Sequence, residues 1–438
     1  MIQKFEWSED QQKVIDCFNN TTDTILITRK TGSGKTMLLK ELVRISGSCI
    51  VSAPTGVAAL NAGGVTLHSL LRLPISPYKP MFMRGQCVSM LQSYSLPIEK
   101  IEIIKATKVL IIDEISMVRA DLLDAVNDAL CYYMENKEPF GGIRVIMVGD
   151  LFQLPPVIKE EDWGAVKKYY NTPYFFSAQI LKYTKLSSFN LDKVFRQRDA
   201  GLVDLLNDIR YGKNSPEILD KLNQLYNPDV DIDNADGWIT LTSTNNEANR
   251  KNTSKLKSIK GKEYKYKAIV TGNFSMKDAI CEETLILKEG AQVMMLVNDN
   301  QNGMYVNGSI GTFLGESETS LDGRVLLIDI DGNVVRVPVF TWEKISYVVD
   351  NENRVCGKPT GKCTQYPVKL AWAITIHKSQ GLTFEKVAID ISRSFAHGQA
   401  YVALSRGVSR EGIVLLNKVK PYNIKCDQTL LANINKLF

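Results

Sequence analysis

The stretch ILITRKTGSGKTMLL, residues 25–39, decides the fold of this chain. The apolar run at 25–28 is typical of a buried strand, and the residues from 37 onward have the apolar spacing of a helix. Between them stands the glycine-rich turn GSGKT at 32–36. A strand, a glycine-rich turn and a helix in this order form a cradle for the phosphates of a nucleoside triphosphate. The stretch therefore predicts an α/β domain that binds ATP.

Each residue of the turn has a chemical task in such a cradle. Gly32 and Gly34, with Ser33 between them, let backbone N–H groups approach the β-phosphate. Lys35 brings a positive charge to the β- and γ-phosphates, and the hydroxyl of Thr36 is a ligand for Mg²⁺. A glycine-rich turn that merely caps a helix is the alternative interpretation of this motif taken alone.

One position departs from the phosphate-loop pattern, because the chain has Arg29 where the full pattern has glycine. The chain must therefore enter the turn without the freedom of glycine at positive φ. Two outcomes are open. Either Arg29 distorts the turn and weakens ATP binding, or the backbone accommodates it while its side chain points into solvent, which we favour.

Two further apolar runs end in carboxylates, KVLIIDE at 108–114 and RVIMVGD at 144–150. Parallel sheets carry their chemistry at the carboxyl ends of their strands. Asp113 is suited to hold Mg²⁺ through water, Glu114 to deprotonate the attacking water, and Gln153 to sense the γ-phosphate. Each strand alone could be ordinary core followed by a turn aspartate. Three such ends beside one phosphate loop favour a hydrolytic site.

Composition sets outer limits on the function. The chain has 438 residues and a net charge of +5, which fits a multi-domain enzyme and permits a nucleic-acid partner without demonstrating one. The sequence contains no long apolar run and its first residues resemble no signal peptide, so we expect an intracellular soluble protein without a membrane partner. Its eight cysteines lack a C-x-x-C pair, which favours reduced thiols over zinc or disulfides.

The order of strand-like and helix-like segments predicts two doubly wound α/β domains. The strands and helices expected in the first domain, residues 1–190, are strands at 24–28, 49–53, 109–113 and 145–150 and helices at 37–45 and 122–134. The pattern resumes in a second domain made of 191–261 and 365–438. Short β-type runs across 262–364 predict a small inserted β-barrel. Residues 70–100, rich in Pro, Met and Tyr, predict an insertion at the edge of the first sheet.

Nine blocks of sequence carry a family resemblance. They are APTGVAALN (53–61), GVTLHS (64–69), DEISM (113–117), VGDLFQLPPV (148–157), FRQ (195–197), TLTSTN (240–245), VNGSIG (306–311), AITIHKSQGLT (373–383) and GQAYVALSR (398–406). In this order they resemble the PIF family of DNA helicases in superfamily 1B, relatives of RecD. The resemblance covers essentially the whole chain, and the last two blocks are far more specific than the phosphate loop.

The resemblance implies a motor of two RecA-like domains, with ATP and Mg²⁺ in the cleft and single-stranded DNA across the top, moving 5′ to 3′. It further implies that 70–100 is a strand-separating wedge and that 262–364 is an SH3-like barrel. The expected partners are single-stranded, forked or structured DNA, and the expected roles are replication, repair, recombination, or telomere or G-quadruplex processing. We expect a monomer when free, cytoplasmic in a bacterium and nuclear or mitochondrial in a eukaryote.

The resemblance also assigns roles to single residues. Gln11 would hydrogen-bond the adenine edge while Ser8 caps the first helix, and Gly381 would belong to the nucleotide site. Arg196 and Arg406 would be arginine fingers at the γ-phosphate, although a lone arginine is most often a surface ion-pair residue. The residues expected to contact DNA are Pro54, Thr55, His68, Ser69, His377, Ser379 and Thr383. For the hydroxyl residues among them, helix capping is the alternative.

Three functions remain open on the sequence. The first is an ATP-driven helicase, and the second is a nucleic-acid clamp whose ATPase is crippled by Arg29. A P-loop nucleotide kinase is disfavoured, because the C-terminal blocks would then have no role. Both of the first two functions predict single-strand binding, so only ATP turnover with and without single-stranded DNA separates them.

Overall fold

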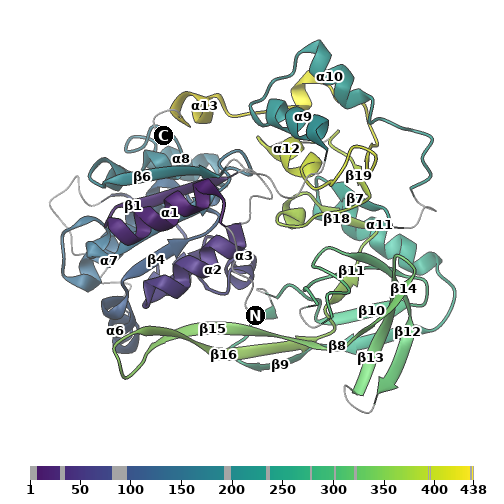
Figure 1. The fold of residues 1–438 in the computed structure, drawn as a ribbon, viewed down its shortest axis with the longest axis horizontal. Coiled ribbons are helices and arrows are strands. Elements are labelled where there is room, and N and C mark those ends of the chain that lie inside the picture. Colours follow the sequence, from purple (N-terminus) through teal and green to yellow (C-terminus); the bar gives the residue numbers. More distant parts are fainter. Residues whose placement is uncertain are drawn as a thin grey trace. The chain divides into compact units, whose positions relative to one another are not determined.

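The computed structural model divides into two compact units (Figure 1). The residues that it describes are 7–29, 35–80, 96–191, 199–232, 237–276, 279–299, 302–319, 323–392, 394, 396–434 and 437. Unit 1 combines Met1–Phe195 with Ile345–Pro359 and Gln428–Phe438. Unit 2 combines Arg196–Lys344 with Thr360–Asp427.

Unit 1 is built on a six-stranded sheet in the order β3-β2-β4-β5-β1-β6. Its strands are β1 (Thr24–Arg29), β2 (Cys49–Ala53), β3 (Val65–Thr66), β4 (Val109–Ile112), β5 (Arg144–Gly149) and β6 (Leu186–Leu191). All neighbouring pairs are parallel. The order brings β4, β5 and β1 side by side, so the three strand ends singled out in the sequence meet at one edge of the sheet.

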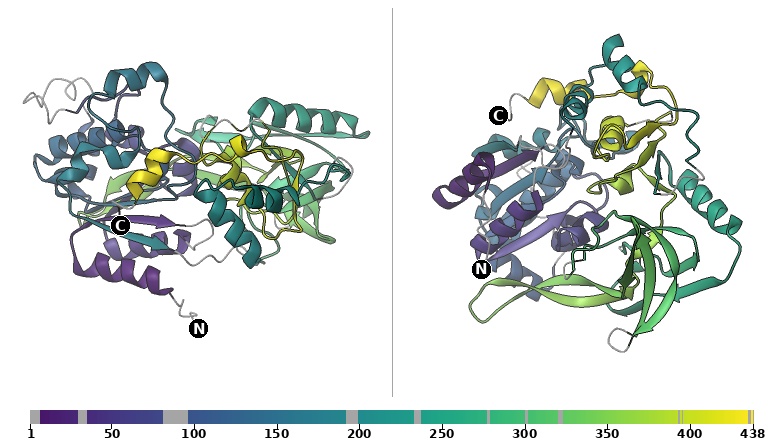
Figure 2. Two further views of the ribbon diagram at one scale, coloured as in Figure 1. Left: turned by 90° about the horizontal axis from the view of Figure 1, so that it is seen from above. Right: turned by 45° about the vertical axis from the view of Figure 1, so that its right-hand side comes forward.

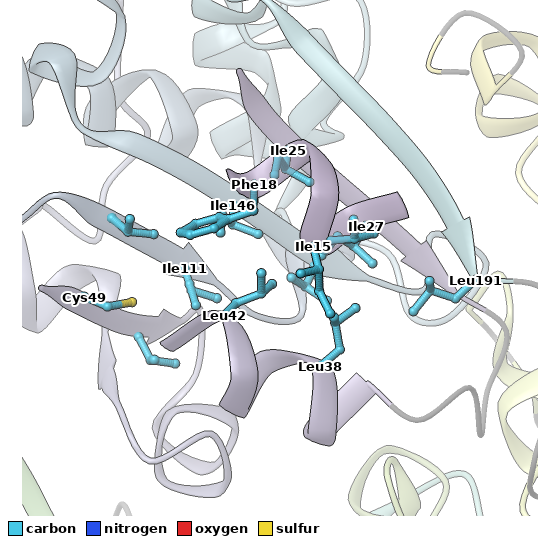
Figure 3. Packing of buried hydrophobic residues seen from close by; sticks show 14 residues of the cluster. Ile15, Phe18, Ile25, Ile27, Leu38, Leu42, Cys49, Ile111, Ile146 and Leu191 are labelled. Carbon is cyan, nitrogen blue, oxygen red and sulfur yellow. The ribbon is translucent and has the colours of Figure 1, made fainter. Parts of the chain in front are cut away.

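Helices accompany this sheet in unit 1. They are α1 (Glu9–Asn20), α2 (Lys35–Ser46), α3 (Gly56–Asn61), α4 (Leu67–Leu71), α6 (Ile98–Ala106), α7 (Ala120–Met134), α8 (Glu160–Val166) and α13 (Gln428–Ile434). Two of them, α1 and α2, complete a core on one face of the sheet. Phe18 of α1 and Leu42 of α2 pack on Ile25 and Ile146 of the strands (Figure 3). Leu26, which points to the opposite face, is equally buried. Burial on both faces explains the continuous apolar runs in the sequence.

A long hairpin extends into unit 1 from a distant part of the sequence. It is formed by β15 (Phe340–Val349) and β16 (Val355–Gln365). The hydroxyl of Tyr347 accepts from the N–H of Val51 at 2.9 Å and lies 3.3 Å from Val51 O, while the N–H of Val355 donates to Ser48 Oγ at 3.0 Å. Ile345–Pro359, which lies within the predicted insertion 262–364, is thus part of unit 1, where Tyr347 bonds to Val51 of β2.

Unit 2 contains a second parallel sheet in the order β18-β7-β19-β20. Its strands are β7 (Ile239–Thr242), β18 (Ala373–Thr375), β19 (Val387–Ile389) and β20 (Ile413–Leu415). The accompanying helices are α9 (Ala200–Arg210), α10 (Pro216–Asn223), α11 (Asn245–Ser258) and α12 (Gln399–Leu404). Figure 2 shows the ribbon in two further views, with the same colours along the sequence. Two parallel sheets with helices confirm the predicted α/β class.

The rest of unit 2 is largely antiparallel β structure. Its strands are β8 (Glu263–Lys267), β9 (Ile269–Gly272), β10 (Thr284–Lys288), β11 (Gln292–Met295), β12 (Ile310–Thr319), β13 (Gly323–Ile330), β14 (Asn333–Val337) and β17 (Val368–Leu370). Five of them form the sheet β14-β13-β12-β11-β17, and β10 pairs with β8. Val293, Phe313, Leu326 and Val368 fill a common apolar core. The short β-type runs of the sequence are therefore strands.

Part of the predicted insertion at 70–100 is described. Residues 72–80 form a loop after α4, and α6 begins at Ile98. Residues 81–95, which make up most of the predicted wedge, lie outside the described residues. Within the part of the chain that the structure describes, no helix is long and apolar enough to cross a membrane.

Candidate functional site

Lys35 begins α2 and is ion-paired with the carboxylates that follow β4. Its Nζ donates to Asp113 Oδ1 at 2.6 Å, to Asp113 Oδ2 at 2.8 Å and to Glu114 Oε1 at 3.3 Å. The three side chains are largely withdrawn from solvent, with exposed fractions of 11%, 9% and 17%. A cation and two carboxylates are therefore brought together at the carboxyl edge of the sheet, where phosphates and a divalent cation need opposite charges.

Local backbone geometry shapes the turn that carries these carboxylates. Glu114 has φ 52°, in the left-handed region, and its N–H donates to Asp113 Oδ1 at 2.7 Å. A non-glycine residue in this region costs of order 1 kcal/mol, so the surrounding structure must hold Glu114 in place. Gly149, at the end of β5, leaves room for the turn, because a Cβ there would lie 3.0 Å from the nitrogen of Ile115. The ends of β4 and β5 are thereby packed together.

Gln153 and Gln11 both lie in supported, buried positions. Gln153 Nε2 donates to Asp150 Oδ2 at 3.3 Å, beside the end of β5. Gln11 forms a capping box with Ser8, in which Gln11 Oε1 accepts from the Ser8 N–H at 3.0 Å and Ser8 Oγ accepts from the Gln11 N–H at 3.3 Å. The N-cap role of Ser8 is confirmed, whereas the adenine contact of Gln11 stays a prediction.

The phosphate loop itself is only partly described. Outside the described residues lie Gly32, Ser33 and Gly34 and the predicted finger Arg196. Thr36 lies in α2, but its side chain is not described. Arg29 is the last residue of β1 and pairs in register with Leu191 of β6, so its backbone is extended. The turn that follows, residues 30–34, lies outside the described residues, so both outcomes named for Arg29 stay predictions.

The hydroxyl residues predicted to contact DNA in unit 1 lie at helix starts. Thr55 is exposed and caps α3, with its Oγ1 accepting from the N–H of Ala58 at 3.2 Å. Pro54 precedes it and is half-buried. Ser69 is exposed on α4, and its backbone oxygen accepts from Lys100 Nζ at 2.9 Å. Capping, the alternative named for these residues, is therefore what Thr55 does, and it leaves the side chain accessible.

His68, also on α4, has two charged neighbours that the sequence did not single out. Burial lowers the pKa of His68, and the positive charge of Arg119 lowers it further. Arg119 is in turn bonded to Asp121 of α7, Nε to Oδ1 and Nη2 to Oδ2, both at 2.8 Å. The sequence feature that could have pointed to Arg119 is its position, because it follows Glu114 by only five residues.

In unit 2, the block 373–383 begins with β18, and its remaining residues form a short turn after that strand. His377 is half-buried, and this burial lowers its pKa. Ser379 is fully buried, and its Oγ donates to Ile376 O at 2.7 Å, so the hydroxyl supports the turn. Gly381 is exposed with φ 81°, a conformation that glycine adopts without strain. Thr383 is half-buried.

Arg406 is fully buried and holds the same turn from within unit 2. Its Nε donates to Val402 O at 2.8 Å, and its Nη1 donates to Ser379 O at 3.3 Å and Leu382 O at 3.1 Å. Its Nη2 donates to Ser405 Oγ at 2.8 Å. The predicted arginine finger is thus engaged with backbone carbonyls here, a position that its sequence motif gives no means of foreseeing.

A lysine at the start of the helix after β1, paired with acidic residues at the end of a neighbouring parallel strand, is the arrangement of P-loop nucleoside triphosphatases. The fold and the site place the chain in this class. Comparison with known families is more specific, because residues 6–217 match the PIF1-like helicase family. The chain belongs to the PIF1-like helicase family.

Three relatives show the extent of the likeness. The crystal structure of Pif1 from Bacteroides sp in complex with ADP-AlF4 matches with a TM-score of 0.90 and 37% identity, covering 99% of this chain and 97% of that one. Bacteroides Pif1 bound to single-stranded DNA matches with a TM-score of 0.67 and 36% identity over 99% and 97% of the two chains. The ATP-dependent DNA helicase PIF1 of Homo sapiens is 33% identical over 441 residues, which are 98% of this chain and 63% of the human protein. The chain spans about three fifths of the length of the curated relatives it matches.

Proposed function

We propose that this chain is an ATP-driven motor that moves 5′ to 3′ on single-stranded DNA and unwinds duplex, forked or structured DNA. The observation that carries the proposal is the pairing of Lys35 with Asp113 and Glu114 at the carboxyl edge of the unit 1 sheet. Two facts about relatives support it. Bacteroides Pif1 has been solved with ADP-AlF4 and with single-stranded DNA, and the human relative is an ATP-dependent DNA helicase.

The carboxylates fit the Mg²⁺ that accompanies ATP. Asp113 and Glu114 already hold a positive charge, that of Lys35, and oxygen donors are the ligands that Mg²⁺ prefers. No group of three or more His, Cys, Asp or Glu in the described residues could hold a metal alone. A magnesium ion shared with nucleotide phosphates needs only one or two protein ligands, here Asp113 and the hydroxyl of Thr36. The ion would neutralise charge on the β- and γ-phosphates.

The catalytic roles follow from the chemistry of the side chains. In the nucleotide complex, Lys35 exchanges its carboxylate partners for phosphate oxygens, which frees Glu114 to accept a proton from the attacking water. Gln153, bonded to Asp150, orients that water or senses the γ-phosphate. Gln11 contacts the adenine, and Gly32, Ser33, Gly34 and Gly381 line the nucleotide. This division of labour makes the two carboxylates separable by mutation.

Arg406 and Arg196 supply the remaining positive charge in this proposal. A planar guanidinium suits the charge that spreads over the transferred phosphoryl group, and an arginine finger contributes roughly 10³-fold or more in rate. Arg406 must exchange at least some of its bonds to Ser379 O and Leu382 O for a phosphate oxygen to do so. Because the same carbonyls belong to the turn that carries His377, this exchange would couple nucleotide state to DNA grip.

The DNA path in this proposal is sequence-independent. Short hydroxyls and histidines suit phosphate and base-stacking contacts that do not read sequence. The residues proposed to line the path are Pro54, Thr55, His68 and Ser69 in unit 1 and His377, Ser379 and Thr383 in unit 2, with Ser379 acting through the turn that it supports. We also propose that 70–100 is the wedge, that 262–364 is an SH3-like barrel, that the free protein is a monomer and that it acts in genome maintenance.

The decisive experiment is steady-state ATP turnover with and without a single-stranded oligonucleotide. We expect the oligonucleotide to stimulate the wild type. Lys35→Ala should lose turnover and keep single-strand binding, because Lys35 acts at the phosphates. Lys40→Ala is the matched control, since Lys40 is an exposed lysine of the same helix, and it should behave as wild type.

Two outcomes would overturn the proposal. A wild type that binds single strands without DNA-stimulated turnover would establish the passive clamp instead. An enzyme that unwinds 3′-tailed duplexes and leaves 5′-tailed duplexes intact would overturn the direction of movement, which rests on the family resemblance.

A further inference from the structure

Arg119 of unit 1 is held in a fixed orientation at the start of α7, which packs against α4, the helix that carries His68. Its Nε and Nη2 form two parallel hydrogen bonds to Asp121, both at 2.8 Å, and Asp121 is only 2% exposed. Asp121 is itself fixed, because its Oδ2 also accepts from the N–H of Tyr78 at 2.9 Å. Two-point pairing with a buried carboxylate removes most of the rotational freedom of the guanidinium. Arg119 is therefore pre-oriented before any ligand binds.

This pairing leaves one nitrogen of Arg119 uncommitted. Guanidinium carries five N–H donors, and the two bonds to Asp121 use one donor on Nε and one on Nη2. In the part of the chain that the structure describes, Nη1 makes no hydrogen bond. The side chain keeps 16% of its surface exposed, and Nη1 is not among the buried side-chain atoms that lack a hydrogen-bond partner, so solvent reaches this nitrogen. Asp162 of α8 is a further carboxylate in this neighbourhood, but it forms no ion pair with Arg119 within 4.0 Å.

His68 supplies a second donor from α4, which packs against α7, the helix that begins after Arg119. Its pKa is lowered by burial first and by the charge of Arg119 second, and an imidazole keeps at least one N–H donor whether it is neutral or charged. A tetrahedral oxyanion such as phosphate offers several acceptor oxygens and suits a guanidinium and an imidazole together.

We infer that Arg119, through Nη1, and His68 together bind one phosphodiester group of a single-stranded nucleic acid, with Asp121 acting as the positioning residue that orients Arg119. This inference rests on the proposed function, since it names a contact on the proposed DNA path. It adds to that path a charged contact that neither the motifs nor the relatives' descriptions assign.

The position of Arg119 also ties this contact to the nucleotide site. The chain runs from Glu114 through the short helix Ile115–Met117 to Arg119. Ile115 and Val118 are fully buried, and Gly149 packs against the nitrogen of Ile115. A short, buried connection transmits displacement instead of absorbing it. A change in the position of Glu114 when nucleotide binds would therefore move Arg119, and DNA affinity at this contact should depend on nucleotide.

The test is the salt dependence of single-strand affinity, measured by fluorescence anisotropy of a labelled oligothymidylate. For Arg119→Gln we expect about tenfold weaker binding at low salt and a slope of log K against log[KCl] that is shallower by about 0.7, the value for one phosphate contact on a single strand. Arg119→Lys, which keeps the charge without the fork, should retain the slope and lose only part of the affinity.

Arg44→Gln is a matched control in the same unit. Arg44 pairs with Glu41 through the same two nitrogens, Nε at 2.8 Å and Nη2 at 2.6 Å, but it lies on the exposed surface of α2. It should leave both the affinity and the slope at wild-type values. Equal melting temperatures for the variants establish that each is folded. If Arg119→Gln does not fold, Arg119→Lys and the nucleotide dependence of its affinity carry the test.

Each result separates this inference from the proposed function. If the wild type binds single strands and Arg119→Gln has the slope of Arg44→Gln, the Arg119 contact is wrong and the motor proposal stands. If the wild type does not bind single strands, both fail. A third arm identifies the source of the phosphate. If inorganic phosphate raises the melting temperature of the wild type but not of Arg119→Gln, while oligonucleotide affinity is equal in the two, the site takes free phosphate and the inference is overturned.

Discussion

Replacing Arg406 by methionine tests whether this guanidinium holds the 377–383 turn in place. Methionine keeps much of the side-chain volume and removes every polar group, so the change avoids a large cavity. It deletes the bonds to Val402 O, Ser379 O, Leu382 O and Ser405 Oγ. The consequences for these acceptors differ, because some of them have another donor.

The loss is concentrated at Leu382 O. Ser379 O also accepts from the N–H of Leu382 at 3.0 Å, and Val402 O also accepts from Ser405 Oγ at 2.9 Å. Leu382 O keeps no other hydrogen bond among the described residues. A buried carbonyl without a partner costs about 1–3 kcal/mol, and relief of the desolvation of the buried guanidinium offsets part of the other losses. We expect the turn to be less stable by about 2 kcal/mol, which is about 30-fold in its opening equilibrium.

Native-state hydrogen exchange measures this opening directly. The amides of Leu382 and Phe384 report it, because Leu382 donates to Ser379 O within the turn and Phe384, just after the turn, donates to Arg406 O. Their exchange should be about 30-fold faster in Arg406→Met. Arg410→Met is the control, since Arg410 is partly exposed and its Nη2 bonds only to Gln224 Oε1 at 3.2 Å. Exchange at these two amides that is no faster in Arg406→Met than in the control would refute the reasoning.

Three further expectations concern other residues. Glu114→Gln should bind nucleotide and fail to turn it over, because an amide does not accept the proton of the attacking water; wild-type turnover would assign Glu114 a structural role. Tyr347→Phe should lower the free energy of unfolding of unit 1 by about 1–3 kcal/mol, because the backbone N–H of Val51 loses its partner; equal denaturation midpoints for variant and wild type would exclude this. Burial raises the pKa of Asp124 to about 6 from 3.8, so the folded state binds this proton more tightly than the unfolded state. As the pH rises from about 4 to about 6, the wild type should therefore lose stability relative to Asp124→Asn. A difference between these two proteins that is constant over that range would contradict the assignment.

The sequence predicted the parallel sheets because their strands are buried on both faces. The strands expected at 24–28, 49–53 and 145–150 are β1, β2 and β5, which end within one residue of the predicted positions. Their apolar runs are continuous and stop at polar residues, a pattern that needs no knowledge of partners. The hairpin of β15 and β16 gave no comparable signal, since most of its residues are exposed or half-buried. Its contact through Tyr347 joins positions 296 residues apart.

The distinction between local pattern and distant contact also separates the site residues that were predicted from those that were not. Lys35, Asp113 and Glu114 stand at the ends of strands or the start of a helix, so their position follows from the local pattern. Arg406, by contrast, bonds to Leu382 O, which is 24 residues away, so its buried position depends on a contact that the local pattern does not show. Arg119 owes its orientation to a buried Asp121, and burial of a carboxylate on α7 is set by what packs over that helix.

Residue type alone also failed to show which hydroxyls are available to a phosphate. Each hydroxyl has one proton, and the fold decides which acceptor receives it. Thr55 accepts the N–H of Ala58 with a lone pair, which leaves its own proton for another acceptor, and the side chain is exposed. The hydroxyl of Ser379 donates its proton to Ile376 O, and the side chain is fully buried. Capping and phosphate binding are therefore compatible at Thr55, whereas at Ser379 a phosphate contact would require the turn held by Arg406 to open first.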